Sequence, residues 1–225
     1  MNVVQKFSQK SRTMAPKTVP KTATPTTVTP NTLSKRQAQL EALMAAAEKR
    51  ICDSGLQSLK ARDLAADIGI ALGGLYNIVA DMDALLLLVS SRTLKRLGEA
   101  ATERTGHLPN ATREEAIERL VAVAHTYLDF ARKNLPLWRM IFELRLDSPL
   151  PEWAAQDQLR LFRHIAEPLS VIMPDLDARG LTIRARTLFA AVHGIISIGL
   201  EERLIAVPVQ KLSDEVAWLT RAACR

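Results

Sequence analysis

The sequence predicts an all-α protein of about nine helices. Three observations support this class: only 4% of the residues are aromatic, 48% are hydrophobic, and apolar side chains recur at helical spacing. Ala, Leu and Ile are abundant, which favours packed helices over sheets. A chain of 225 residues can bury a sizeable core in one or two domains.

Residues 1–32 are predicted to form a disordered basic arm rich in Thr and Pro. Prolines recur from Pro16 to Pro30 at intervals of four or five residues, which excludes a continuous helix. Residues 1–40 carry seven Lys or Arg and no acidic residue, whereas the rest of the chain is nearly balanced. The arm is either a contact for a polyanion such as DNA or a solubilising tail.

The predicted helices follow the arm, and several have clear start or stop signals. Ser34 is expected to cap the first helix, which Gly55 ends, and Asp81 is expected to cap a long helix. Thr112 with Glu115 predicts a capping box for the next one. The other expected ranges are 60–68, 72–79, 82–103, 113–133, a short helix from Pro136, 152–173 with a kink at Pro168, 177–206 and 213–223.

A helix-turn-helix is predicted over residues 61–78, ARDLAADIGIALGGLYNI. Ala65 supplies the small residue where the second helix crosses closely, and Gly69 supplies the left-handed turn. An ordinary helical hairpin with a glycine turn is the alternative. Apolar residues fill the five expected core positions: Leu64, Ile68, Ile70, Leu75 and Ile78.

Residues 38–89 resemble the N-terminal domain of TetR (tetracycline-repressor) family regulators. Gly55 follows the first helix, GGLY at 73–76 opens the recognition helix, and DMDAL at 81–85 opens the fourth helix. The chain departs from the family at Ile78-Val79, where a His-Phe pair is usual, and at Met82, where a phosphate-binding Lys is usual. The resemblance implies a cytoplasmic bacterial transcriptional regulator. Its DNA-binding domain would span 33–82, and its effector-binding and dimerisation domain 83–225.

The resemblance also implies which residues contact an operator. The recognition helix would lie in the major groove, with Asn77 pairing to adenine and Tyr76 donating to a phosphate. Lys35 and Arg36 would extend these contacts along the backbone. Plain solvent exposure is the alternative for the polar residues. The predicted DNA-binding set is Lys60, Arg62, Leu72, Gly73, Gly74, Tyr76 and Asn77.

Members of this family bind an effector between their middle helices, so the resemblance implies a cavity for a small apolar or amphipathic molecule. His125 and Tyr127 lie on the helix that often lines such cavities and could orient a polar ligand group. Core packing is the alternative for the aromatic residues. The predicted ligand-binding set is His125, Tyr127, Trp138, Phe142, Phe162, Phe189 and His193.

The last two helices are expected to form a homodimer interface, with Trp218 and Leu219 as anchors. The pair His193-Gly194 resembles one subgroup of the family. Small residues thin one face of its helix and would let another backbone approach: Ala190, Ala191, Gly194, Ser197 and Gly199. An effector would shift the fourth helix and change the separation of two recognition helices on a palindromic operator, which describes a ligand-responsive repressor.

Other classes lack supporting residues. The four histidines have no metal-ligand partners, and no phosphate loop, nucleophile elbow or dinucleotide fingerprint occurs, so no enzyme, cofactor or metal is expected. Cys52 and Cys224 are far apart and fit a reducing compartment, and no apolar run is long enough to span a membrane. Two alternatives remain: a helical effector-binding protein that no longer reads DNA, and a helical enzyme with His125 or His193 as base.

Overall fold

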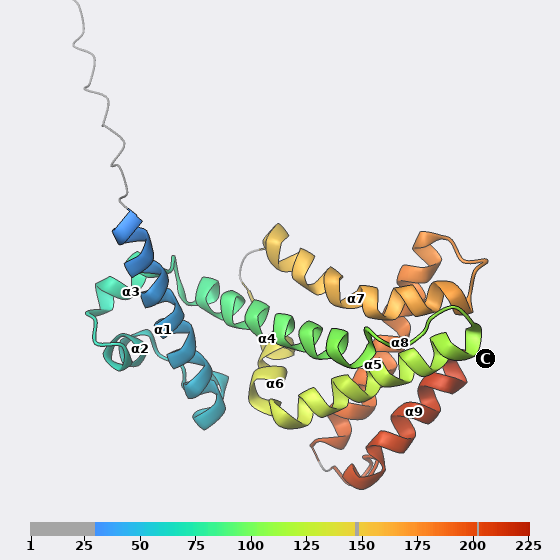
Figure 1. Ribbon diagram of the computed structural model, residues 1–225. Helices are drawn as coiled ribbons and strands as arrows, with labels where there is room; N and C mark the ends of the chain where they lie inside the picture. The colour runs from blue at the N-terminus through green and yellow to red at the C-terminus, as the bar shows by residue number, and fades with distance from the viewer. Residues whose placement is uncertain (1–29, 147–148, 202) are drawn as a thin grey trace, which may run out of the picture.

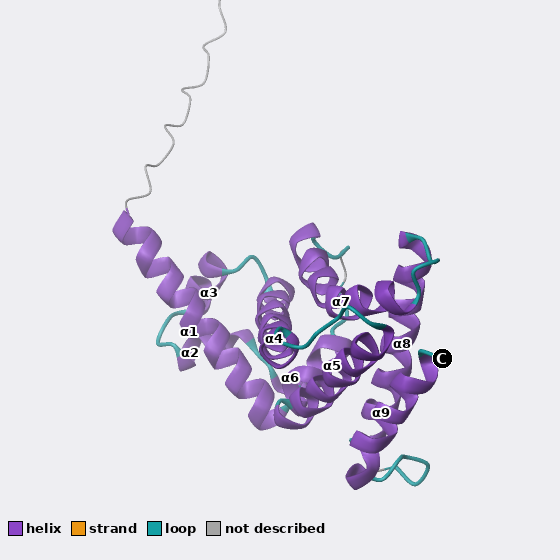
Figure 2. Ribbon diagram, turned by 45° about the vertical axis from the view of Figure 1, so that its right-hand side comes forward, coloured by secondary structure: helices purple, strands orange, loops and turns teal. Residues whose placement is uncertain are grey.

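The computed structural model describes residues 30–146, 149–201 and 203–225, and all regular structure in these ranges is helical. This confirms the predicted all-α class. Helices α1 to α3 form a small lobe at one end, and α4 leads from it into a larger bundle that ends with α8 and α9 (Figures 1 and 2). The arm predicted over residues 1–32 lies outside the described residues up to residue 29.

Nine α-helices and two short 3₁₀ helices make up the described chain. In chain order they are α1 (Pro30–Ser54), η1 (Leu56–Ser58), α2 (Ala61–Asp67), α3 (Leu72–Ile78), α4 (Met82–Thr105), α5 (Arg113–Lys133), α6 (Leu135–Glu143), α7 (Glu152–Ile172), α8 (Ala178–Gly199), η2 (Val209–Lys211) and α9 (Leu212–Ala223).

The first helix begins earlier than the sequence suggested. We predicted Ser34 as its N-cap, but α1 begins at Pro30. Proline is favoured at a first helical position because its φ is preset and its missing N–H has no intrahelical partner there. The predicted end is confirmed: Gly55 adopts φ 77° and donates its N–H to the Ile51 carbonyl at 2.9 Å.

The two predicted side-chain caps of later helices are confirmed. Asp81 accepts a hydrogen bond from the Ala84 N–H at 2.7 Å, and Asp177, which was not predicted as a cap, begins α8 in the same way. Thr112 and Glu115 form the complete capping box of α5, whose bounds match the predicted range. These caps are short-range interactions, so each helix start follows from its own sequence.

Helix α8 is shorter than predicted, since it ends at Gly199 and not near residue 206. The chain must turn there because α9 packs back against α8. A Cβ atom at Gly199 would collide with the Leu212 side chain of α9, so the absent side chain permits this approach. The predicted spacing of small residues therefore serves one close contact within the chain.

Two hydrophobic cores lie on either side of α6. The smaller core joins α1, α2 and α3 to the start of α4, and it includes Leu137 and Met140 of α6. The larger core joins α4 to α9 and includes Trp138, the neighbour of Leu137. Opposite faces of one nine-residue helix thus belong to different cores.

Candidate functional site

The turn between α2 and α3 has the geometry that the sequence predicts. Gly69 adopts φ 69°, and the Ile70 N–H bonds to the Ala65 carbonyl at 2.9 Å across the turn. Ala65, Leu64 and Leu75 are almost wholly buried between the helices. A side chain at residue 69 would be strained in this conformation, so glycine fixes the angle between the two helices.

The outer face of α3 is exposed and carries little charge. Leu72, Gly73, Tyr76 and Asn77 are exposed, and Tyr76 retains 47% of its accessible surface. Gly74 differs from the expected exposure because it is half-buried, with the Ile70 side chain 3.6 Å from where its Cβ would lie. Four of the five predicted α3 contacts therefore face outward together.

The two predicted basic contacts flank this face at the start of α2. Lys60 and Arg62 are both exposed, and neither forms an ion pair within the described residues. Arg36 is engaged, since it donates to the carbonyl of Ile78 at the end of α3 at 3.5 Å. Arg36 therefore helps to hold α1 against α3, a role that the sequence did not suggest.

An ion pair that sequence reasoning missed locks α1 to α2. Arg50 binds both carboxylate oxygens of Asp67, and this bond lowers the pKa of Asp67. Because bidentate Arg–carboxylate pairs fix orientation, the pair supports the position of α2. The two residues lie 17 positions apart, so no local pattern pointed to them.

An apolar cavity of about 250 Å³ lies in the larger bundle, between α4, α5, α6, α7 and α8. Five of the seven predicted ligand-binding residues line it: Tyr127, Trp138, Phe142, Phe162 and Phe189. Their rings contact one another, with Tyr127 and Phe189 centroids 5.6 Å apart and Trp138 and Phe142 centroids 5.5 Å apart. Four separate helices thus bring these aromatic side chains to one space.

Polar groups gather at the aromatic end of the cavity. The Tyr127 hydroxyl lies 2.8 Å from His193 Nδ1, and the His193 ring packs on Phe142 with centroids 4.2 Å apart. Burial raises the pKa of Tyr127, although the nearby Trp138 N–H opposes the rise, and burial lowers the pKa of His193. Both groups are therefore neutral near pH 7.

Trp138 leaves a hydrogen-bond donor unused. The side chain is 2% exposed, and its Nε1 atom has no hydrogen bond of normal geometry, although it lies near the Tyr127 hydroxyl. An unsatisfied buried donor costs about 1–3 kcal/mol, so such a group calls for an explanation.

His125 does not belong to this cavity, and our prediction for it was wrong. Its Nε2 lies 3.1 Å from the carbonyl of Ser213, on the side of α5 that faces α9. His125 and Tyr127 are two positions apart on one helix, so their side chains leave it in different directions. The helical period of 3.6 residues, counted from Tyr127, would have placed His125 on another face and excluded it from the predicted ligand-binding set.

Several cavity residues were missed by the sequence reasoning. Leu94 and Leu97 of α4 form one wall, and Gln158 and His164 of α7 stand near Phe162. Burial lowers the pKa of His164. The helical spacing of Gln158, Leu161, Phe162 and Ile165 was the available signal, because it places these side chains on one face of α7.

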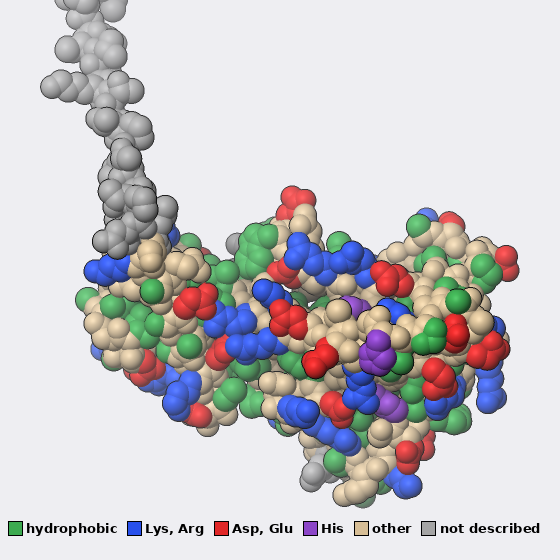
Figure 3. All heavy atoms as spheres, viewed as in Figure 1, with side chains coloured by type: hydrophobic (Ala, Val, Ile, Leu, Met, Phe, Trp, Pro, Cys, Tyr) green, Lys and Arg blue, Asp and Glu red, His purple; other side chains and the backbone are tan. Residues whose placement is uncertain are grey.

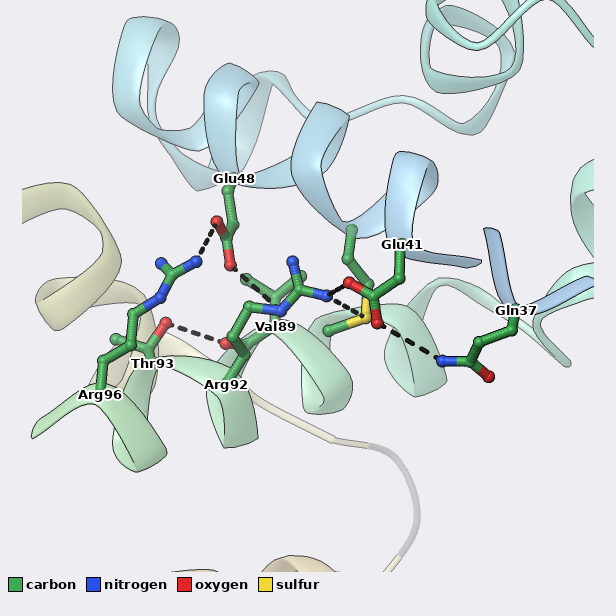
Figure 4. Close-up of polar contacts among 8 residues, drawn as sticks. Gln37, Glu41, Glu48, Val89, Arg92, Thr93 and Arg96 are labelled. Atoms are coloured by element: carbon green, nitrogen blue, oxygen red, sulfur yellow. Dashed lines mark hydrogen bonds and ion pairs between the residues drawn. The ribbon is translucent and has the colours of Figure 1, made fainter. Parts of the chain in front are cut away.

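An ion-pair network ties the small lobe to α4 (Figure 4). Arg92 of α4 pairs with Glu41, and its Nε lies 3.7 Å from Glu48 Oε1. Arg96, one turn along, bonds to the other oxygen of Glu48 at 3.0 Å. The Glu48 and Arg92 side chains are only 14% and 20% exposed, so solvent screens this network less than an ordinary surface pair.

The exposed face of α8 is apolar in its second half, whereas Arg184, Arg186 and Thr187 are exposed in its first half. Ile183 and Ile198 are exposed, and Ala190, Ala191 and Gly194 lie between them on the same side. Trp218 of α9 is 63% exposed. Among the described residues, α8 is the one single helix long and apolar enough to cross a membrane, and α3 with α4 passes the same test as a pair bent by 56°. One such helix is too weak a signal to assign a membrane-spanning segment.

Charged side chains elsewhere are mixed in sign. On the face drawn in Figure 3, Lys or Arg and Asp or Glu alternate along the middle of the molecule. Several are paired, such as Arg104 with Asp129 at 2.8 Å and Arg221 with Glu118 at 2.8 Å. Within the described residues no group of three His, Cys, Asp or Glu side chains is placed to hold a metal ion.

Comparison with known proteins supports one family. Residues 120–222 match the family described as "Tetracyclin repressor-like, C-terminal domain". A search of curated protein sequences finds no significant match.

Solved structures resemble the chain over most of its length. A protein of unknown function from Rhodococcus sp. RHA1 shares 18% identity over 83% of this chain and 96% of its own, with a TM-score of 0.66. A TetR-family transcriptional regulator from Streptomyces coelicolor shares 18% over 82% and 96%, with a TM-score of 0.59. RolR, solved in complex with resorcinol, shares 15% over 84% and 89%, with a TM-score of 0.60.

These structures share the fold of the chain, and the family match covers α6, α7, α8 and most of α5, which line the cavity together with α4. The subgroup suggested by His193-Gly194 stays a prediction. TetR-family proteins are transcription factors with a ligand-binding domain and are not enzymes. Residues 120–222 thus match the tetracycline-repressor-like C-terminal domain, and the described chain, with its helix-turn-helix, shares the fold of solved TetR-family regulators.

Proposed function

We propose that the chain is a ligand-responsive repressor, acting in the cytoplasm as a homodimer on a palindromic operator. Residues 33–82 would read DNA, and residues 83–225 would bind the effector and dimerise. The observation that carries this proposal is the exposed face of α3, presented by a buried glycine-turn scaffold and flanked by two free basic side chains.

Each exposed residue would have a distinct role on DNA. Asn77 would pair with a base edge in the major groove, and Tyr76 would donate its hydroxyl to a phosphate. Lys60 and Arg62 would bind phosphates beside the start of α2, whose dipole also favours negative charge. Gly73 would let the backbone of α3 approach the DNA, because nothing lies within 4 Å of its Cβ position.

Two copies are needed to read a palindrome, and the apolar faces of α8 and α9 supply a surface for pairing. Trp218→Glu is expected to convert the dimer to a monomer, because a carboxylate replaces a central apolar side chain. Trp153→Glu, at an exposed Trp of α7, is the matched control and should leave the dimer intact. Analytical ultracentrifugation measures both, and equal masses for the two variants would argue against this interface.

Contacts of α6 and α4 support a coupling between the effector cavity and the DNA-reading lobe, α1 to α3. Trp138 lines the cavity, whereas Leu137 and Met140 on the same helix pack into the DNA-reading lobe. Helix α4 makes a second link, through cavity residues Leu94 and Leu97 and through the Arg92 ion pairs to α1. An effector that binds one arrangement of α4 and α6 more tightly would shift the two recognition helices and release the operator.

Genome-wide footprinting followed by binding to the recovered duplex tests the proposal. Asn77→Ala is expected to lower discrimination between operator and random duplex by about 1–3 kcal/mol, with non-specific binding retained. Lys60→Ala is the matched variant, and it should weaken binding to both duplexes equally and reduce the salt dependence. Equal, wholly salt-dependent binding of the wild-type protein to all duplexes would refute it and favour an effector-binding protein that no longer reads DNA.

A further inference from the structure

The walls of the cavity restrict the shape of its ligand. An apolar cavity of about 150 Å³ holds benzene in a protein core, so the 250 Å³ here suits a molecule of one or two rings. Five aromatic side chains surround the space, and such walls favour stacked or edge-to-face contact with another ring. A long flexible chain would gain less from this rigid lining.

The lining also restricts the charge of the ligand. None of the described residues that line the cavity is Lys, Arg, Asp or Glu. His164 is the titratable base in the wall, and burial lowers its pKa. A carboxylate or an ammonium ion would lose its hydration here and find no opposite charge, which disfavours its entry.

The hydrogen-bonding side chains of the lining include Tyr127 and Trp138, as well as Gln158 and His164 of α7. The Tyr127 hydroxyl lies 2.8 Å from His193 Nδ1, and in the tautomer with Nδ1 unprotonated it donates to that nitrogen, which leaves the Tyr127 oxygen free to accept a hydrogen bond. The Trp138 N–H needs an acceptor. One group can satisfy both residues: a hydroxyl, which donates to the Tyr127 oxygen and accepts from the Trp138 N–H.

We propose that the effector is an uncharged one- or two-ring compound with a hydroxyl group, held at the Tyr127–Trp138 end with its rings against Phe142, Phe162 and Phe189. This inference rests on the proposed ligand-responsive function. It also states what the effector changes. The Trp138 donor is sealed and unpaired without ligand, so pairing it displaces Trp138 and, with it, the helix that packs against the DNA-reading lobe.

Calorimetric titration of the full-length protein with three matched probes tests the ligand class. 2-Naphthol carries the hydroxyl, 2-methylnaphthalene replaces it by a methyl group, and 2-naphthoate is an anion at neutral pH. We expect 2-naphthol to bind about tenfold or more tightly than 2-methylnaphthalene, and 2-naphthoate to bind most weakly. Equal binding of the first two, stronger binding of the anion, or no binding of any probe would overturn the proposal.

Trp138→Phe isolates the hydrogen bond from the packing. The variant should lose most of the preference for 2-naphthol over 2-methylnaphthalene, whereas a merely loosened core would weaken both probes alike and keep their ratio. Trp153→Phe, at the exposed Trp of α7, is the control and should keep both affinities. Operator binding measured without any probe tests the regulator function independently of the ligand class. Failure of the ligand proposal alone would leave this binding intact.

Discussion

At the scale of single residues, two glycines of the helix-turn-helix have different structural roles. Gly69 and Gly73 lie four residues apart, yet only Gly69 adopts a positive φ. Gly73 lies within α3, and its Cβ position is open. The first glycine is required by backbone conformation, whereas the second is a helix residue whose small size matters only to a partner outside the chain.

Gly69→Ala is therefore expected to lower the free energy of unfolding by about 1–2 kcal/mol, because L-residues pay that amount in the left-handed region. Gly73→Ala should leave stability unchanged or raise it by up to about 1 kcal/mol, since alanine favours the helix. Urea unfolding followed by circular dichroism measures both. A Gly69→Ala variant as stable as the wild type would contradict the role assigned to the turn.

At the scale of helices, α4 is the main connection between the lobe and the bundle, and Glu48 of α1 is its most enclosed charged partner. The carboxylate lies between two arginines and is 14% exposed. Charge pairing of this kind is worth more than a surface pair, because less water competes for the ions.

Glu48→Gln is expected to lower the free energy of unfolding by about 1–2 kcal/mol, between the values typical of surface and buried pairs. Glu99→Gln removes an exposed partner of Lys95 on α4 and is the matched control, with an expected change within about 0.5 kcal/mol. Hydrogen exchange should show faster opening of α1 in the first variant. Equal effects of the two substitutions would show that enclosure does not strengthen the network.

The helices were predictable where their determinants are local. Asp81, Thr112 and Asp177 cap their helices through bonds that span three residues, so the sequence alone located these starts. The end of α8 depends on the fit of Gly199 to Leu212, and the direction of His125 depends on how α5 meets α9. These contacts join distant segments, so no local pattern identifies the partner of either residue, although the helix period excludes His125 from the face of Tyr127.

The candidate site shows the same division. Aromatic composition and the family resemblance pointed to five residues that the fold does bring to one cavity. The unused Trp138 donor and the Glu48 network arise only when helices far apart in sequence meet. The exposed α3 face followed from the motif itself, because a helix-turn-helix fixes which side of its second helix is free.

At the scale of the whole molecule, titratable groups set the pH range of stability. Burial lowers the pKa of His193, and it lowers that of His164, where Glu167 opposes the shift and Arg119 and Arg163 add to it. The unfolded chain binds these protons more readily, so stability falls as pH drops below the ordinary histidine value of 6.5.

The carboxyl groups of Asp67, Glu115 and Glu118 have lowered pKa values through their hydrogen bonds. Their contribution is present above the ordinary values near 4 and is lost as pH falls through the folded ones.

Stability should therefore be nearly constant between pH 8 and 7, fall below pH 7 as the two histidines of the unfolded chain become protonated, and fall further below about pH 4.5 as the carboxyl groups do. The urea midpoint measured across this range checks the profile. His164→Gln should flatten the first decline because one of the two half-buried histidines no longer titrates. A decline as steep as that of the wild type would mean that other groups cause it.

The shared helix α6 also limits how such a protein can be recombined. Leu137 and Met140 complete the core of the DNA-reading lobe, although they follow it by more than fifty residues in the chain. Consider a hybrid protein in which α1 to α3 come from another regulator and the chain from α4 onward comes from this one. It would keep Leu137 and Met140 but lose their partners on α1. Replacement of the DNA-reading lobe would therefore succeed only where the new α1 packs against Leu137 and Met140 of α6. DNA specificity and protein stability would have to be redesigned together.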